Sequence, residues 1–74
     1  MSPTGDDPAA RVRTLLLRGD NVMKSARPER FERALEAFEE ARGVAADPAV
    51  EPRVRDLIDR RIESLRALIG SRDE

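Results

Sequence analysis

The chain has 74 residues, a formal net charge of −1, and neither His nor Cys. This length allows one small domain, and without disulfides or a His/Cys zinc site that domain must be stabilised by helix packing or by association. The same absences remove the usual catalytic base and thiolate nucleophile, and the near-zero charge argues against sequence-independent nucleic-acid binding, so we expect no enzyme, no metal, no cofactor and no nucleic-acid partner.

The first predicted helix spans residues 8–26 and follows a predicted flexible tail at 1–7. Asp7-Pro8 is a typical helix start, because the Asp side chain can cap free N–H groups and Pro loses no hydrogen bond at the first helical position. Gly19 costs about 1 kcal/mol relative to Ala inside a helix, so we expect another backbone to come close there. The apolar residues at the spacing of one helix face are Val12, Leu15, Leu16, Gly19, Val22, Met23 and Ala26.

The second predicted helix spans residues 28–45. Arg27-Pro28 marks the break, because the residue before a proline disfavours helix and Pro suits a first helical position. Glu29 and Arg33 are spaced to form a surface ion pair. We interpret Glu36, Glu39 and Glu40 as a solvated acidic face, since metal sites in helix bundles combine Glu with His. The apolar stripe comprises Phe31, Ala34, Leu35, Phe38, Ala41 and Ala45.

The third predicted helix spans residues 52–69, after a connection bounded by Pro48 and Pro52. Gly70 is a plausible helix stop, which leaves 71–74 as a tail. Its apolar positions are Val54, Leu57, Ile58, Ile62, Leu65, Leu68 and Ile69. Short connections make sequential helices antiparallel, so residues 8–70 are predicted to form one all-α domain, a three-helix antiparallel bundle.

The first two helices resemble the helical hairpin of the tetratricopeptide repeat. That family alternates bulky and small residues on its first helix, and spaces Ala, an aromatic residue and Ala along its second helix before a closing Pro. The matching residues are Leu15, Gly19 and Val22 in the first helix, and Ala34, Phe38, Ala41 and Pro48 in and after the second. The resemblance implies two closely packed helices, with the third helix as the solvating cap that such arrays need.

The three-helix layout is also similar to the microtubule-interacting-and-trafficking domain, whose third helix Arg60-Arg61-Ile62-Glu63-Ser64-Leu65 resembles. Both families bind proteins or peptides in a groove, which implies a non-catalytic interaction module with a protein or peptide partner. In tetratricopeptide domains the binding surface comes mainly from the first helix. The corresponding residues here are Arg13, Leu16, Asp20, Met23 and Lys24. For Leu16 and Met23 the alternative is core packing against the third helix.

A second interpretation is a structural or regulatory subunit that acts through homo-oligomerisation or within a larger complex. A lone repeat does not bury a continuous core, and Leu17, Leu68 and Ile69 are candidates for a self-association surface. No stretch approaches the roughly 18 apolar residues of a membrane span, and the first residues are acidic, so we expect no membrane contact and a cytoplasmic location. The preference for Arg over Lys is typical of a GC-rich bacterial genome.

Overall fold

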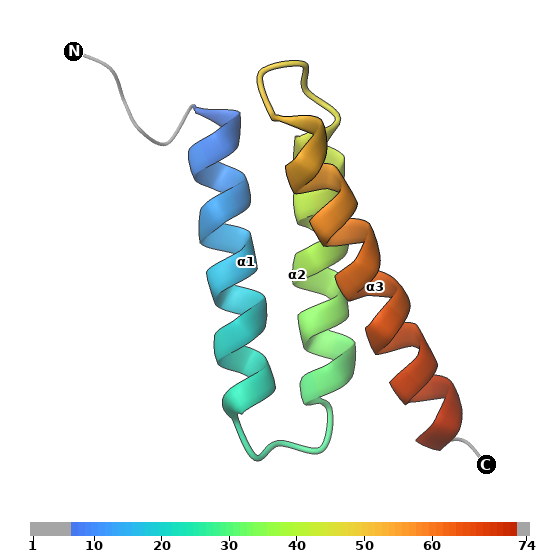
Figure 1. The fold of residues 1–74 in the computed structure, drawn as a ribbon. Helices are drawn as coiled ribbons and strands as arrows, with labels where there is room; N and C mark the ends of the chain where they lie inside the picture. Colours follow the sequence, from blue (N-terminus) through green and yellow to red (C-terminus); the bar gives the residue numbers. More distant parts are fainter. Residues whose placement is uncertain (1–6, 73–74) are drawn as a thin grey trace.

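The computed structural model describes residues 7–72, which form three α-helices and no strand. The helices are α1 (Pro8–Lys24), α2 (Arg30–Ala45) and α3 (Pro52–Arg72), and each runs antiparallel to the one before it (Figure 1). The predicted all-α three-helix bundle is therefore confirmed. The predicted tail residues 1–6, 73 and 74 lie outside the described part of the chain.

Helix α1 begins where the sequence predicts and ends two residues earlier. The Asp7 carboxylate accepts a hydrogen bond from the Ala9 N–H at 3.1 Å, which satisfies one of the free donors of the first turn. At the other end Ser25 is extended, and its hydroxyl and its N–H both donate to the Val22 carbonyl, at 2.7 and 3.0 Å. These bonds end the helix at Lys24. Ala26, which was predicted to be helical, therefore lies outside the helix.

Helix α2 begins at Arg30, two residues later than predicted. Pro28 and Glu29 form a turn, closed by a hydrogen bond from the Arg30 N–H to the Arg27 carbonyl at 3.2 Å. The expected surface pair between Glu29 and Arg33 is present at 3.8 Å. The buried face of the helix consists of Ala34, Ala37, Phe38, Ala41 and Ala45. Small side chains therefore make up most of this face, which allows neighbouring helices to approach closely.

The connection from α2 to α3 is a turn that also contributes to the core. The Asp47 carboxylate accepts from the Ala49 N–H at 2.8 Å, and the Asp47 carbonyl accepts from the Val50 N–H at 3.0 Å. This turn directs Val50 inward, where the side chain is buried. Helix α3 then runs to Arg72, so the prediction that Gly70 stops the helix is wrong; residues 71 and 72, assigned to a tail, are helical. Gly70 has no positive φ and simply continues the helix.

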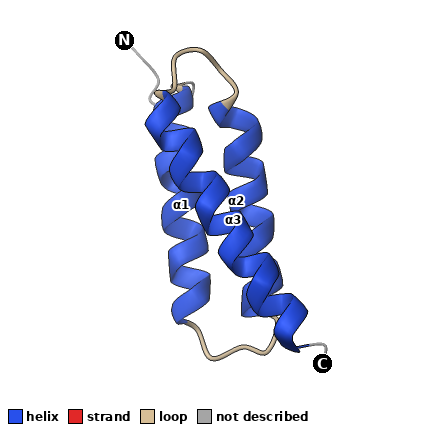
Figure 2. Cartoon of the chain, turned by 45° about the vertical axis from the view of Figure 1, so that its right-hand side comes forward, coloured by secondary structure: helices blue, strands red, loops and turns tan. Residues whose placement is uncertain are grey.

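Helix α3 packs on α2 and crosses one face of the α1–α2 hairpin (Figure 2). One cluster of buried apolar side chains joins all three helices and the second loop. Its members are Val12, Leu15, Ala34, Phe38, Ala41, Ala45, Val50, Ile58, Ile62 and Leu65. Burial of α3 thus depends on three side chains spaced along one face, Ile58, Ile62 and Leu65.

Gly19 is buried opposite the ring of Phe38. A Cβ atom added at Gly19 would lie 2.6 Å from Cε1 and 2.7 Å from Cζ of that ring, well inside van der Waals contact. The close neighbour is therefore an aromatic side chain and not, as the sequence suggested, another backbone. Phe38 fills the space left by Gly19 on α1 and by the alanines of α2.

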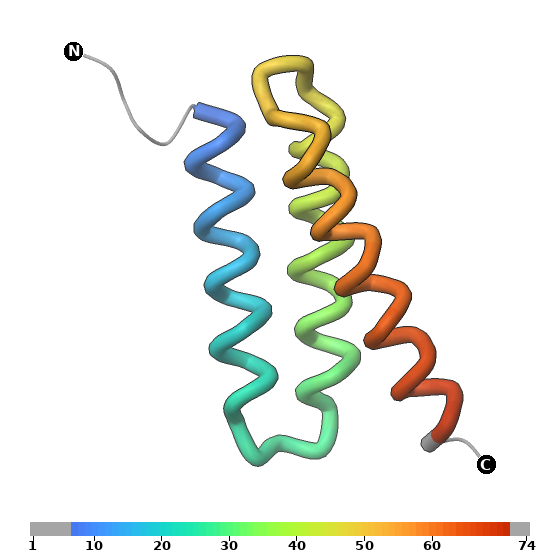
Figure 3. Tube along the Cα trace, in the orientation of Figure 1, coloured from blue at the N-terminus to red at the C-terminus, as the bar shows by residue number. Residues whose placement is uncertain are grey.

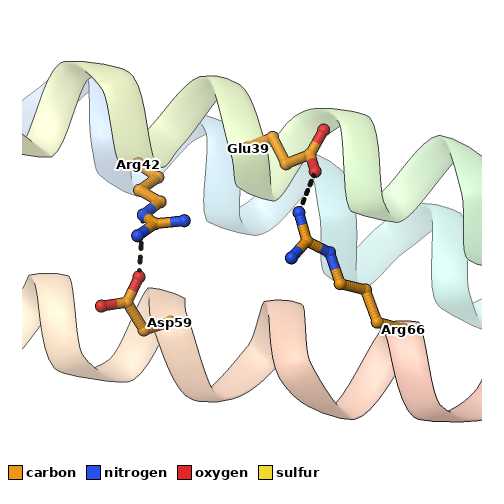
Figure 4. A network of polar contacts seen from close by, with 4 residues as sticks. All are labelled: Glu39, Arg42, Asp59 and Arg66. Carbon is orange, nitrogen blue, oxygen red and sulfur yellow. Dashed lines mark hydrogen bonds and ion pairs between the residues drawn. The ribbon is translucent and has the colours of Figure 1, made fainter.

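Ion pairs at the surface link α3 to both other helices. Arg42 of α2 pairs with Asp59 at 3.0 Å, and Glu39 pairs with Arg66 at 3.0 Å (Figure 4). Asp20 of α1 pairs with Arg61 at 2.6 Å. All six side chains are partly exposed, so each pair contributes at most about 1 kcal/mol and serves mainly to set how α3 lies on the hairpin.

Candidate functional site

A groove of about 340 Å³ lies between the first halves of α1 and α3. The two helices run in the same direction and separate along their length, as the chain trace shows (Figure 3). Because each packs mainly on α2, the space between them is lined by side chains and by the second loop. The lining residues are Ala9, Val12, Arg13, Leu16, Ala49, Val50, Glu51, Val54 and Leu57.

The groove has apolar walls and a charged rim. Val12 and Val50 are buried, Leu16 and Val54 are half-buried, and Leu57 is 45% exposed. Arg13 and Glu51 are exposed and bring one charge of each sign to the lining. Such a surface offers apolar contact to a ligand, and its one carboxylate, Glu51, is exposed at the rim.

An ion pair bridges α1 and α3 one helical turn beyond the apolar lining. Asp20 follows Leu16 by four residues and Arg61 follows Leu57 by four residues, and their side chains are joined by a hydrogen-bonded ion pair of 2.6 Å. The Arg61 guanidinium also lies 5.9 Å from the centre of the Phe38 ring. The groove is therefore bounded at this end by a link between its two walls.

The structure brings together two of the five predicted partner-binding residues. Arg13 and Leu16 line the groove. Asp20 is on the same side of α1 but is bound to Arg61 within the chain. Met23 is half-buried and packs against the core, and Lys24 is exposed at the last position of α1. Leu16 and Met23 both pack against the buried cluster, and Leu16 also lines the groove.

Sequence reasoning missed the part of the groove that the second loop contributes. Ala49, Val50 and Glu51 lie between two prolines in a segment read as a connection. An apolar Val in such a short, proline-bounded segment is the signal that could have found it. Val54 and Leu57 were recognised as apolar positions of the third helix, but their side chains reach the groove rather than the centre of the core.

The acidic residues of α2 do not assemble into a metal centre in residues 7–72, where no group of three or more carboxylates is placed to hold an ion. Glu39 is instead bound to Arg66 of α3. Among the helices described, none is long and apolar enough to cross a bilayer.

No protein-family model matches the chain, and neither the curated proteins nor the solved structures contain a match.

Proposed function

We propose that the chain is a non-catalytic interaction module that binds a short helical segment of a partner protein in the groove between α1 and α3. The proposal rests on the apolar lining between α1 and α3. Because each of these helices packs mainly on α2, this lining is not covered within the chain. Leu57 is 45% exposed at its edge, although burying a leucine is worth about 1.5–3 kcal/mol. A partner's apolar side chain would cover Leu57 and Leu16 together.

The size of the groove limits what it can hold. Its volume of about 340 Å³ is near the lower end of the range of about 300–1,000 Å³ found for ligand pockets. We therefore expect one or two apolar anchors of an amphipathic helix at i and i+3 or i+4 spacing, rather than a whole helix face. Arg13 and Glu51 would orient such a segment through charges at its ends.

The proposed relationship to the tetratricopeptide repeat has its own support. Ala34 and Ala41 are fully buried, and Gly19 faces the Phe38 ring, as that family's close helix packing requires. Arg13 and Leu16 of α1 line the groove, and the resemblance implies a binding surface on the first helix. Like the resemblance to the microtubule-interacting-and-trafficking domain, this proposed relationship implies a protein or peptide as the partner.

The test is a selection of helical peptides from a display library, followed by binding measurements with two matched variants. Leu57→Glu places a charge in the groove, whereas Leu68→Glu places the same charge on an equally exposed leucine of the same helix, outside the groove. We expect selected peptides to lose at least about tenfold in affinity with Leu57→Glu and to bind Leu68→Glu like the parent chain. Equal loss in both variants, or no selected peptide at all, would show that the groove is not a binding site.

The second candidate function is assembly with further copies of this chain, as a structural or regulatory subunit. Leu17 is 58% exposed and Leu68 46% exposed, and Ile69 beside Leu68 is half-buried. These side chains lie outside the groove and would be covered in an oligomer. Sedimentation of a strict monomer at millimolar concentration would remove this candidate.

A further inference from the structure

A second hollow, of about 590 Å³, lies on the α1–α2 hairpin and shares no residue with the groove. It is formed by the second half of α1, the first loop and the start of α2, with no contribution from α3. The lining residues are Thr14, Leu17, Arg18, Asn21, Val22, Ser25, Arg27, Arg30 and Arg33. Because four of these nine residues are arginines, we call this surface the arginine hollow.

The positive charge of the arginine hollow is only partly compensated: Glu36 and Glu40 line an adjacent hollow with Arg18 and Arg33 but form no ion pair with them. In residues 7–72 no carboxylate lies within ion-pair distance of Arg18 or Arg27. Arg33 has Glu29 at 3.8 Å, and both side chains are about half exposed. The Arg30 guanidinium lies 4.8 Å from the centre of the Phe31 ring. A chain of net charge −1 thus places four cations from three segments around one hollow.

Apolar surface lies among these cations. Leu17 is 58% exposed, the most exposed large apolar side chain of the described residues, and Val22 is half-buried. Thr14, Asn21 and Ser25 add small polar side chains on α1 and at its end. The surface therefore offers apolar contact and cations to the same ligand.

We propose that the arginine hollow binds an acidic segment of a partner protein in which carboxylates flank one apolar side chain. Guanidinium groups match carboxylates in a bidentate geometry, and Leu17 with Val22 provides the contact for the apolar side chain. Charge complementarity also speeds the encounter of such a partner with the chain. A nucleic acid fits less well, because the hollow has no aromatic side chain on which a base could stack.

The probe is a fluorescently labelled synthetic helical peptide with one Leu between Glu residues, measured by anisotropy against the full chain. Two control peptides replace the Leu by Gln or every Glu by Gln. We expect saturable binding of the parent peptide that weakens as salt rises, and at least about tenfold weaker binding of each control. A Leu-to-Gln peptide that binds as well as the parent would reduce the hollow to a non-specific basic patch and overturn the proposal.

A charge-reversal pair locates the binding on the chain. Arg18→Glu with Arg27→Glu removes two cations that make no ion pair, so the fold is expected to persist, and circular dichroism verifies this. Arg53→Glu with Arg55→Glu makes the same net charge change in the exposed first turn of α3. The proposal requires a loss of at least about tenfold in the first variant and less than about twofold in the second. Equal losses of peptide affinity in the two double variants would overturn the proposal.

Two further measurements separate this proposal from its competitors. The backbone and side-chain amide signals of Asn21 should shift in nuclear magnetic resonance spectra when the peptide binds, and the backbone amide signal of Glu51 in the groove should not. Leu57→Glu should leave peptide binding unchanged, which distinguishes this site from the groove of the proposed function. A labelled single-stranded oligonucleotide that binds more tightly than the peptide would assign the hollow to polyanions and contradict an acidic protein segment.

Discussion

At Gly19 the absence of a side chain matters more than the flexibility of the backbone. The residue has an ordinary helical φ, so any L-residue could adopt its conformation. What prevents a larger residue is the Phe38 ring, which is buried and sits 2.6 Å from the place of the missing Cβ. Gly43 and Gly70 are also helical, but nothing lies within 4 Å of a Cβ added there. Space for a side chain is thus missing at Gly19 but present at Gly43 and Gly70.

We predict that Gly19→Ala destabilises the fold, whereas Gly43→Ala stabilises it. Both changes gain about 1 kcal/mol of helix propensity. At Gly19 the added methyl group must displace Phe38 in a filled core, which costs about 1–3 kcal/mol, so the net change is a loss. Urea unfolding followed by circular dichroism measures both free energies. The same sign for the two variants would mean that Phe38 does not pack against Gly19.

At the scale of the elements, α3 is held by two kinds of contact of unequal strength. Ile58, Ile62 and Leu65 are buried against the hairpin, while the ion pairs of Arg42, Arg61 and Arg66 are partly exposed. Burial of one such apolar side chain is worth about 1.5–3 kcal/mol, against at most about 1 kcal/mol for an exposed ion pair. The apolar face therefore determines whether α3 docks, and the charges refine its position.

On this helix we predict that Ile62→Ala destabilises the fold far more than Arg66→Ala. Ile62→Ala should lower the free energy of unfolding by about 2–5 kcal/mol, because it leaves a cavity under α3. Arg66→Ala should lower it by less than about 1 kcal/mol, because Glu39 regains water. Chemical denaturation at low salt measures both. Similar losses for the two variants would show that α3 is held mainly by charge.

The helices could be predicted from the sequence, and so could three of their six termini, at Pro8, Ala45 and Pro52; the other termini and most of the groove could not. Periodic apolar residues such as Val12, Leu15, Ile58 and Ile62 identify the elements, because only helical spacing brings them onto one face. The end of α1 depends on hydrogen bonds of Ser25, and serine has no strong preference for the C-terminal end of a helix. The pairing of Asp20 with Arg61 joins residues 41 positions apart and follows only from how the helices pack.

For the whole molecule, the small size makes every core contact important. Globular chains gain about 0.05–0.15 kcal/mol of stability per residue, which amounts to about 4–11 kcal/mol for 74 residues. A single buried isoleucine is a large share of that total. Because Phe38 lies in one cluster with residues of α1 and α3, the hairpin and its third helix are expected to unfold together.

Because the core is shared, we predict that backbone amides of α2 and α3 exchange their hydrogens through a common unfolding event. The amides of Phe38 in α2 and Ile62 in α3 should exchange with closely similar opening free energies, both near the global value. Those of Ala67 and Ser71, in the exposed last turns of α3, should exchange much faster. Exchange of Ile62 well ahead of Phe38 would show that α3 leaves the hairpin independently.

The bridge between Asp20 and Arg61 has a consequence for which ligands the groove can accept. A helical ligand lying along α1 would reach this bridge about one turn, roughly 5.4 Å, beyond Leu16 and Leu57. To extend further, the ligand would have to offer Arg61 a carboxylate of its own in exchange for Asp20. The groove would then select ligands by the number of residues between the apolar anchor and the acidic residue. In this way the ion pair within the chain would contribute to selectivity for ligand sequence.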